Sequence, residues 1–291
     1  MEIGKRILIT GSSGFLGKSI CKEMQKAGYK ISTFDILEGK DILDYKQVLA
    51  SLKNCDVCLH LAAVSDLYIA DSNPEQCDKL NIEGTKVVAK ACNDKNVKLL
   101  YASTCCVYGN NNIAISSEES LPSPSELYAE SKLQGEIVVK KSGCNYRILR
   151  LATFYGRNMR ASLATSLLLK KNILREIIDI HGTGEQTRCY THVDDVSRGI
   201  RIAYEKSETP EIINIADDIA YSVIDLIQII EKVTGKKSIT RFVKDRQGQI
   251  INGSINSDLL KNYGWKPTWT LEQGLKDYFE VNYLPYPDID K

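Results

Sequence analysis

The chain has 291 residues, of which 43% are hydrophobic and 26% charged, and its formal net charge at pH 7 is +1. This length suits one large α/β domain or two unequal ones, and a net charge near zero argues against binding to nucleic acid or to an anionic membrane. The first apolar run, residues 6–10, is too short for a signal peptide or a membrane-spanning helix, so we expect no membrane association and a cytoplasmic location.

Nine cysteines are scattered through segments with strand and helix patterns. With an odd number and no secretory signal, they are typical of reduced thiols in a cytosolic protein. Cys55 and Cys58 form a C-x-x-C, but this lies in a predicted strand and no second ligand pair with zinc spacing accompanies it. We therefore predict no metal site.

A short strand, a glycine turn and a helix open the chain. Residues 6–10 are apolar and β-branched, as in a buried strand, and Gly11, Gly14 and Gly17 follow them before a helix over residues 18–27. This is the local shape of a dinucleotide-binding unit, because glycines let the backbone approach a pyrophosphate and the helix N-terminus points its free N–H groups at the anion. An ordinary tight β–α turn is the alternative.

Residues 31–34 are predicted to form a second strand, which ends at Asp35. An acid at this position accepts both hydroxyls of an adenine ribose and repels a 2′-phosphate, so it favours NAD over NADP as the cofactor. A simple turn-forming aspartate is the alternative.

Strands and helices then alternate at βαβ spacing, which predicts a Rossmann-type doubly wound parallel sheet with helices on both faces. Helices are expected at 45–52, from 73–74 to 92, and at 126–141; strands are expected at 55–61, 97–103 and 146–153, with a loop at 109–124. Beyond residue 156 the pattern loosens into helices at 161–171, 194–205 and 222–233 and a strand at 177–180. We expect an NAD-binding domain at 1–155 and a smaller α/β substrate lobe at 156–291, partly interleaved with it.

Tyr128 and Lys132 lie one turn apart on one face of a predicted helix. A nearby ammonium favours the phenolate and lowers the pKa of the phenol, and a nicotinamide cation adds to this effect, so the pair can supply a general base. The spacing alone arises by chance about once in a chain this rich in tyrosine and lysine. The preceding strand, however, ends at Ser103 and Thr104, and a hydroxyl there can hold the same substrate oxygen, although strand-end hydroxyls commonly bind backbone instead.

These motifs, taken in order, resemble the extended short-chain dehydrogenases/reductases of the NAD-dependent nucleotide-sugar epimerase/dehydratase family. The resemblance covers nearly the whole chain. Its elements are ITGSSGFLG, HLAA, Asn81-x-x-Gly84-Thr85, YASTCCVYG, YAESK, GTGEQTRCYTHVDDV and GWKPTWTLEQGL.

The resemblance implies a role for each residue that matches the family pattern. The implied cofactor-binding residues are Gly11, Gly14, Phe15, Leu16, Gly17, Asp35, Asp41, Ile42, Leu61, Ala62, Ala63, Asn81, Tyr128 and Lys132. The implied catalytic residues are Thr104, Tyr128 and Lys132, and the implied substrate-binding residues are Ser65, Thr104, Arg188 and Arg246. The two arginines would hold a sugar-bound diphosphate bidentately; unspecific surface charge is the alternative for each.

The family's reactions begin when the tyrosine takes a proton from a sugar hydroxyl, usually at C4, while hydride passes to NAD. In its dehydratases an Asp-Glu pair follows the catalytic threonine, but Cys105 and Cys106 stand there in this chain. The resemblance therefore implies an NAD-dependent nucleotide-sugar 4-epimerase that acts through a transient 4-keto sugar. A 4-ketoreductase or C4 dehydrogenase is the alternative; a 4,6-dehydratase or a non-catalytic NAD-binding protein fits less well.

Cys106 leaves one further option open. In GDP-fucose synthase a cysteine at this place helps to epimerise carbons next to the ketone, but the partner histidine would fall near Asn158, where no histidine stands. His60, His181 and His192 lie in strand-like contexts, and we assign none of them a catalytic role. The resemblance also implies a homodimer in which helices 81–92 and 126–141 pair with their copies.

Overall fold

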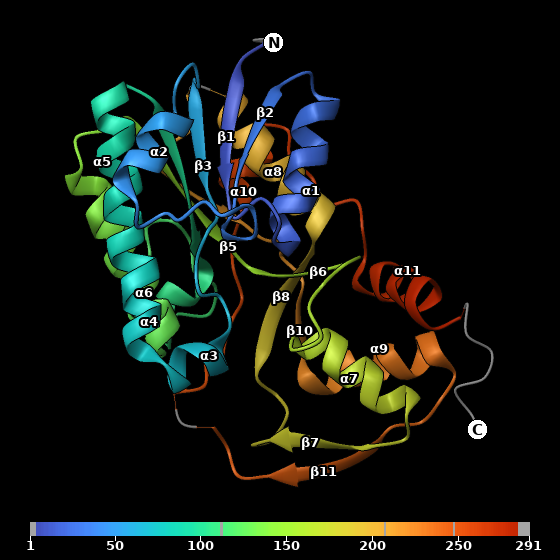
Figure 1. Cartoon of the computed structure of the whole chain (residues 1–291). Coiled ribbons are helices and arrows are strands. Elements are labelled where there is room, and N and C mark those ends of the chain that lie inside the picture. The colour runs from blue at the N-terminus through green and yellow to red at the C-terminus, as the bar shows by residue number, and fades with distance from the viewer. Residues whose placement is uncertain (1–3, 111–112, 207, 247, 285–291) are drawn as a thin grey trace.

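Six parallel strands form the main sheet of the computed structural model, which describes residues 4–110, 113–206, 208–246 and 248–284 (Figure 1). The strand order is β2-β1-β3-β4-β5-β9. The strands are β1 (Arg6–Thr10), β2 (Lys30–Phe34), β3 (Val57–His60), β4 (Lys98–Thr104), β5 (Tyr146–Leu151) and β9 (Ile212–Ile215). The direction of winding reverses between β1 and β3, and ligands of such sheets bind at the carboxyl ends of the strands at this point.

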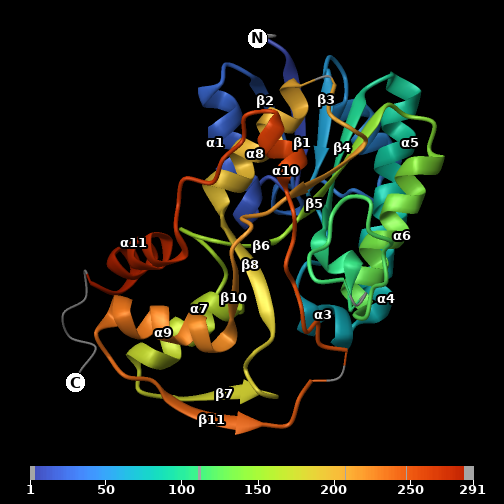
Figure 2. The ribbon, with the colours of Figure 1, turned by 180° about the vertical axis from the view of Figure 1, so that it is seen from behind.

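Helices cover both faces of the sheet (Figures 1 and 2). On one face lie α1 (Phe15–Lys26) and α8 (Val193–Glu205); on the other lie α2 (Tyr45–Ser51), α5 (Thr85–Lys95) and α6 (Leu127–Lys141). Alternate residues of β1 enter two different cores, Ile7 and Ile9 on the α1 side and Leu8 on the α5 side. The doubly wound architecture expected from the sequence is confirmed.

The segment between β3 and α5 is more divided than the sequence predicts. It contains α3 (Leu67–Ser72), α4 (Pro74–Asp78) and a π-helical segment (Lys79–Gly84) in place of one continuous helix from 73–74. Asp66 accepts hydrogen bonds from the backbone of Tyr68 and Ile69 and so starts α3, while Asn73 caps α4 in the same way. These local caps explain the extra helix, which the apolar periodicity of the sequence does not mark.

The second lobe lies below the carboxyl ends of the main strands in Figure 1. A three-stranded sheet, in the order β10-β8-β6, joins β6 (Thr153–Tyr155), β8 (Thr187–His192) and β10 (Ala220–Ser222), and a two-stranded parallel ribbon joins β7 (Ile177–His181) to β11 (Ile239–Val243). The lobe's helices are α7 (Ala164–Ile173), α9 (Val223–Thr234) and α11 (Leu271–Tyr283), which pack around a core of their own. A short helix, α10 (Asp258–Asn262), packs instead against α8 and β9.

The chain crosses between the lobes several times. The predicted strand 146–153 ends at Leu151, and the chain then enters β6 of the second lobe. It later returns to the main sheet with α8 and β9, both of which lie beyond residue 155. The described part of the chain contains no helix long and apolar enough to cross a membrane.

Candidate active site

The glycine turn lies at the carboxyl end of β1, where backbone segments meet too closely for side chains. Gly11 has φ +69°, and a Cβ on it would lie 2.8 Å from the Ala62 nitrogen. A Cβ on Gly17 would lie 2.2 Å from the Gly11 oxygen. Helix α1 begins directly after Gly14, which has no side chain to cap it, so the N–H groups of the first turn face outward for an anion. Phe15 and Leu16 form that first turn.

Asp35 follows β2 and lies beside this turn. Its Oδ2 accepts a hydrogen bond of 2.9 Å from the Ser13 N–H, and its Oδ1 accepts one of 3.0 Å from the Leu37 N–H. Each carboxylate oxygen has a second lone pair with which to bind a ligand hydroxyl. The Asp41 carboxylate accepts a hydrogen bond from the Leu43 N–H in the turn that follows it. Ile42 is buried against Gly84, and a Cβ on this glycine would lie 2.5 Å from the isoleucine Cδ1.

Residues 61–63 follow β3 and form a wall opposite the glycine turn. Thr10 Oγ1 accepts from the first two backbone N–H groups of this wall, both at 3.2 Å. Asn81 holds the next residue on both sides: its Oδ1 accepts from Val64 N at 2.8 Å, and its Nδ2 donates to Val64 O at 3.0 Å. The same Nδ2 donates to Ser131 Oγ at 2.9 Å, which ties the wall to α6.

His60 lies beneath this wall, and both of its ring nitrogens have partners. Nδ1 lies 2.7 Å from Thr10 Oγ1, and Nε2 lies 3.2 Å from Thr85 Oγ1. Burial, reinforced by the charge of Lys132, lowers the pKa of His60 to about 3. The ring is therefore neutral at pH 7 and joins β1, β3 and α5.

Thr104, Tyr128 and Lys132 come together at the carboxyl end of β4. Thr104 is the last residue of the strand, and its Oγ1 accepts a hydrogen bond of 3.2 Å from the Cys106 N–H. Tyr128 lies half-buried in the first turn of α6, and the Thr104 side chain acts to lower the pKa of its phenol. Lys132, one turn further on, is 3% exposed, and its Nζ lies 4.2 Å from the centre of the Tyr101 ring.

The pKa of the tyrosine differs from the sequence-based expectation. Burial raises the pKa of Tyr128 above its usual value, and the neighbouring Cys106 adds to this rise. Burial also lowers the pKa of Lys132 to about 7, although Glu136 acts in the opposite direction. In the protein alone, burial therefore outweighs the lowering effect expected from Lys132, whose ammonium lies over the Tyr101 ring.

A buried ion pair fixes α6 against the strands that carry these residues. The Arg150 guanidinium on β5 donates to Glu136 on α6 through Nε at 2.9 Å and through Nη2 at 2.7 Å. Ser103, at the end of β4, donates to the same carboxylate at 2.6 Å. Both charged side chains are almost fully buried, so the position of α6 relative to β4 and β5 is strongly constrained.

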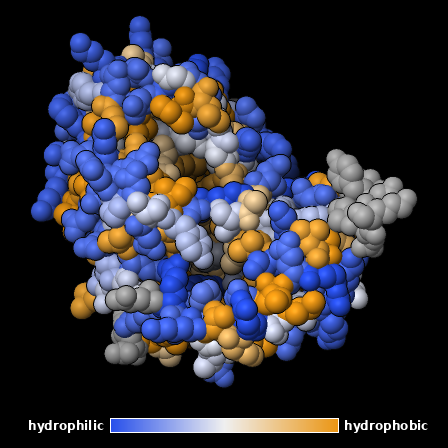
Figure 3. Space-filling model, turned by 60° about the horizontal axis from the view of Figure 1, so that its bottom comes forward, coloured by the Kyte–Doolittle hydropathy of each residue, from blue (hydrophilic) through white to orange (hydrophobic). Residues whose placement is uncertain are grey.

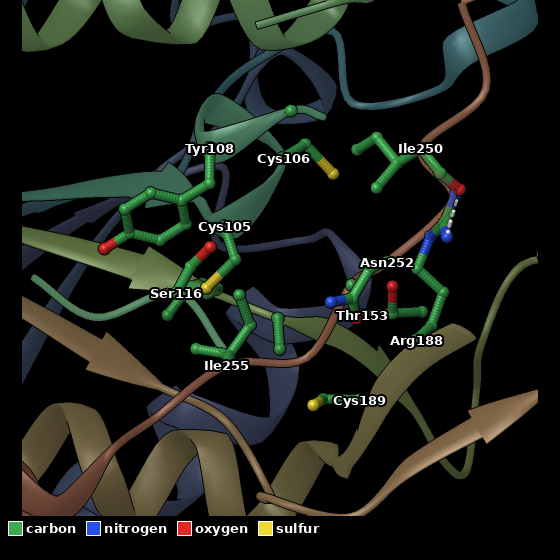
Figure 4. A pocket seen from close by; sticks show the side chains of 14 residues that line it. Cys105, Cys106, Tyr108, Ser116, Thr153, Arg188, Cys189, Ile250, Asn252 and Ile255 are labelled. Carbon is green, nitrogen blue, oxygen red and sulfur yellow. Dashed lines mark hydrogen bonds between the residues drawn. The ribbon is translucent and has the colours of Figure 1, made fainter. Parts of the chain in front are cut away.

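Arg188, on β8, lines a small cavity of about 30 Å³ between the two lobes. Its Nη1 donates to the carbonyl oxygens of Thr187 at 2.7 Å and Ile250 at 2.8 Å. Figure 4 shows the Cys106 side chain at the same cavity. Seen from the end where the second lobe lies, the molecular surface is hollowed near its centre (Figure 3).

Arg246 lies close to the start of α6, where its Nη2 pairs with Glu126 Oε1. Burial raises the pKa of Glu126, while Arg246 and Arg188 both lower it. The structure thus places the two predicted arginines around one acid. Sequence reasoning missed this acid, although its position two residues before Tyr128 could have drawn attention to it.

Ser65 is held by an arginine that sequence reasoning also missed. Arg160 donates from Nη1 to Ser65 Oγ at 3.0 Å and from Nη2 to Ser65 O at 2.7 Å, and its Nε lies 3.7 Å from Asp66 Oδ2. The Arg160 charge also acts to lower the pKa of Tyr128. No motif surrounds this arginine, so only the folded chain reveals it.

The two thiols that follow Thr104 have different surroundings. Cys105 is buried and donates to the Arg150 carbonyl at 3.3 Å, whereas Cys106 is partly exposed in the cavity. All nine cysteines are free thiols. Among the described residues, no group of three or more histidine, cysteine or acidic side chains is arranged to hold a metal ion.

Known proteins of similar structure include a UDP-glucuronic acid 4-epimerase from Bacillus cereus, solved with UDP-glucuronic acid and NAD. Its sequence is 28% identical to this chain, and the structures align with a TM-score of 0.87 over 96% of this chain and 100% of the epimerase. A UDP-glucose 4-epimerase from Thermotoga maritima, solved with UDP-glucose, is 26% identical, with a TM-score of 0.87 over 95% and 99%. In sequence, the chain is 29% identical to an uncharacterized UDP-glucose epimerase of Bacillus subtilis (strain 168), over 96% of this chain and 98% of that protein.

The model of a protein family also matches residues 7–216 of the chain. That family is described as the NAD dependent epimerase/dehydratase family, which confirms the family resemblance and the expected cofactor, NAD. The matched range begins in β1 and ends just after β9, so it contains every strand of the main sheet. The chain therefore belongs to the NAD dependent epimerase/dehydratase family.

Proposed function

We propose that this protein is an NAD-dependent nucleotide-sugar 4-epimerase that acts through a transient 4-keto sugar. One observation carries the proposal: Thr104 ends β4 and Tyr128 lies in the first turn of α6, which packs against that strand, while thiols occupy the two positions after Thr104. Inversion at C4 needs a group that takes and returns one proton, and it needs no further acid or base. The UDP sugars bound by the two epimerases of similar structure support a nucleotide sugar as the substrate.

The residues around the glycine turn fit NAD. The backbone at Gly11 and Gly17 and the N-terminus of α1 would hold the pyrophosphate, and Asp35 would accept the ribose hydroxyls. Lys132 would contact the nicotinamide ribose. When bound, NAD would supply the acceptor of the hydride from C4 and then its donor to the opposite face of the ring.

Tyr128 and Thr104 handle the proton. Thr104 holds the oxygen on C4, and Tyr128 accepts the proton of that hydroxyl as hydride leaves the carbon; the same proton returns when the ketone is reduced. Because burial raises the pKa of Tyr128, the phenolate needs nearby positive charge. Lys132, together with the cofactor's nicotinamide cation, would supply it.

Arg188 and Arg246 would hold the diphosphate while the sugar ring turns over. A guanidinium binds a phosphate through two parallel hydrogen bonds, so binding energy is placed on the nucleotide and away from the sugar. The 4-keto sugar is then free to present either face to the cofactor.

Incubation with UDP-, GDP-, CDP- and dTDP-hexoses, followed by NMR of the products, tests the proposal. We expect C4 inversion with at least one of these sugars and retention of NAD through turnover. No inversion with any of them would refute the proposal. Net oxidation or reduction of the sugar, with free exchange of cofactor, would favour the C4 dehydrogenase or ketoreductase.

We also propose that the protein is a homodimer built on helices α5 and α6. These helices lie side by side on the outside of the sheet, and Val87, Leu133, Ile137 and Val138 remain partly exposed on them. Light scattering tests this: a dimer is expected, and a monomer at micromolar concentration would contradict it.

A further inference from the structure

Glu126 is a buried acid at the substrate site to which the proposed mechanism gives no role. It directly precedes α6, its side chain is 6% exposed, and it pairs with Arg246. Buried carboxylates are rare unless they are paired. The Glu126 carboxylate places a negative charge beside the arginines that are proposed to bind an anion.

The position of Glu126 is fixed by its neighbours. Ser125 Oγ donates a hydrogen bond of 2.9 Å to the Gly248 carbonyl. A Cβ on Gly248 would lie 2.6 Å from the Ser125 oxygen, so the two backbones are in direct contact. The segment that carries Arg246 is therefore packed against the start of α6, and Glu126 cannot easily leave the site.

Glu126 pairs with Arg246 and stands two residues before Tyr128 in the chain. Burial raises the pKa of the Cys106 thiol; the charge of Glu126 raises it further, and the charge of Arg188 lowers it. Cys106 and Arg188 also line the same cavity (Figure 4). A sugar whose C4 oxygen reaches Tyr128 and whose diphosphate reaches the arginines must pass beside Glu126.

Among the residues that the structure describes, the cations of this region already have partners. Glu126 offsets one of the two positive charges of Arg188 and Arg246, whereas a sugar diphosphate brings two negative charges. Arg160, a further cation close to Tyr128, is already engaged by Ser65 and Asp66, and the Lys132 ammonium lies over the Tyr101 ring. A carboxylate on the sugar would therefore meet uncompensated negative charge, while a sugar hydroxyl could donate a hydrogen bond to Glu126.

We propose that Glu126 selects nucleotide sugars whose hexose carries no carboxylate and rejects those of uronic acids. This inference rests on the proposed function and names the substrate class of the same site. Like charges placed together at a binding site cost several kcal/mol, so the preference for the neutral sugar is expected to be roughly 100-fold.

Binding to the NAD-loaded Tyr128→Phe protein tests the inference without turnover. Dissociation constants for UDP-glucose and UDP-glucuronic acid are measured by calorimetry. We expect UDP-glucose to bind roughly 100-fold more tightly. A second substitution, Glu126→Gln, keeps a side chain able to accept from Arg246 but removes the charge, and it should bring the ratio to within about tenfold, mainly by tightening UDP-glucuronic acid. Glu130→Gln, on the exposed face of the same helix, is the matched control and should leave the ratio unchanged.

The outcomes separate charge selection from simple positioning of Arg246. If Glu126→Gln weakens both sugars by the same factor, the residue only positions the arginine and the inference is overturned. Equal affinities before the substitution also overturn it, and so does a failure of both sugars to bind. Absence of C4 inversion by the wild-type enzyme would refute the proposed function, and the binding ratio would still decide the role of Glu126.

Discussion

The Asn81 amide donates a hydrogen bond of 2.9 Å to the Ser131 hydroxyl, and this bond joins the wall beside the glycine turn to the helix that carries Tyr128 and Lys132. Asn81 also makes two hydrogen bonds to the backbone of Val64. One side chain therefore sets the spacing between the proposed cofactor site and the proposed catalytic residues.

Asn81→Ala is expected to weaken NAD binding and to lower kcat/KM. Loss of these buried hydrogen bonds should lower the free energy of unfolding by about 1–3 kcal/mol, which leaves the fold intact. Cofactor titration and urea unfolding measure the two effects. Asn93→Ala, at an exposed position of α5, is the control and should change neither. Wild-type NAD affinity in Asn81→Ala would show that the wall does not depend on this residue.

Tyr128→Phe is expected to reduce turnover by about 10²- to 10⁴-fold, because it removes the proposed proton acceptor but keeps the ring. NAD affinity should change little, since the wall and the glycine turn are untouched. Steady-state kinetics and cofactor titration measure both quantities, with Tyr45→Phe on α2 as a matched control. Unchanged turnover would show that the base has been misassigned.

Arg150→Met is expected to destabilise the protein strongly, because it leaves the Glu136 carboxylate buried without its counter-charge. The free energy of unfolding should fall by roughly 3–5 kcal/mol. Adding Glu136→Gln, which removes the stranded charge and keeps an acceptor for Ser103, should restore part of this loss. Chemical unfolding of the single and double variants measures the coupling, and purely additive losses would contradict a mutually dependent pair.

The stability of the fold should depend on pH through His60. The pKa of this residue is about 3 in the folded protein and near 6.5 in the unfolded chain, so the unfolded chain binds an extra proton between these values. The stabilisation is complete above pH 6.5 and falls by about 1.4 kcal/mol per pH unit as the pH drops toward 3. His60→Gln removes this dependence, so the difference between the two unfolding free energies should change with that slope. A constant difference between pH 6.5 and pH 4 would rule out a buried neutral histidine.

Five of the six strands of the main sheet could be predicted because they have simple patterns. The bounds of β1 agree fully with the prediction, and α6 differs by only one residue. The strands β8 to β11 were missed. They are short or polar, and four of the five residues of β11 are exposed, so no apolar alternation marks it.

The candidate site was foreseen where it depends on local motifs and missed where it depends on packing. The glycine turn, Asp35 and the Tyr128–Lys132 pair have fixed spacings in the sequence. The contacts of Arg160 with Ser65 and of Arg246 with Glu126 join segments that lie far apart along the chain. The position of the Lys132 ammonium over the Tyr101 ring depends on the packing of α6 against β4. The effect on the pKa of Tyr128 could not be derived before these contacts were known.

The pairing of β5 with β9 affects how the protein is made. Residues 152–211 separate the two strands, and they include the part of the second lobe from β6 to β8 and helix α8. During synthesis on the ribosome, the edge of β5 that pairs with β9 stays without a partner strand until residue 215 has left the exit tunnel. Such an open edge readily pairs with other chains, so the nascent protein passes through a stage that is prone to aggregation. A fragment cut at residue 155 would remain at that stage permanently.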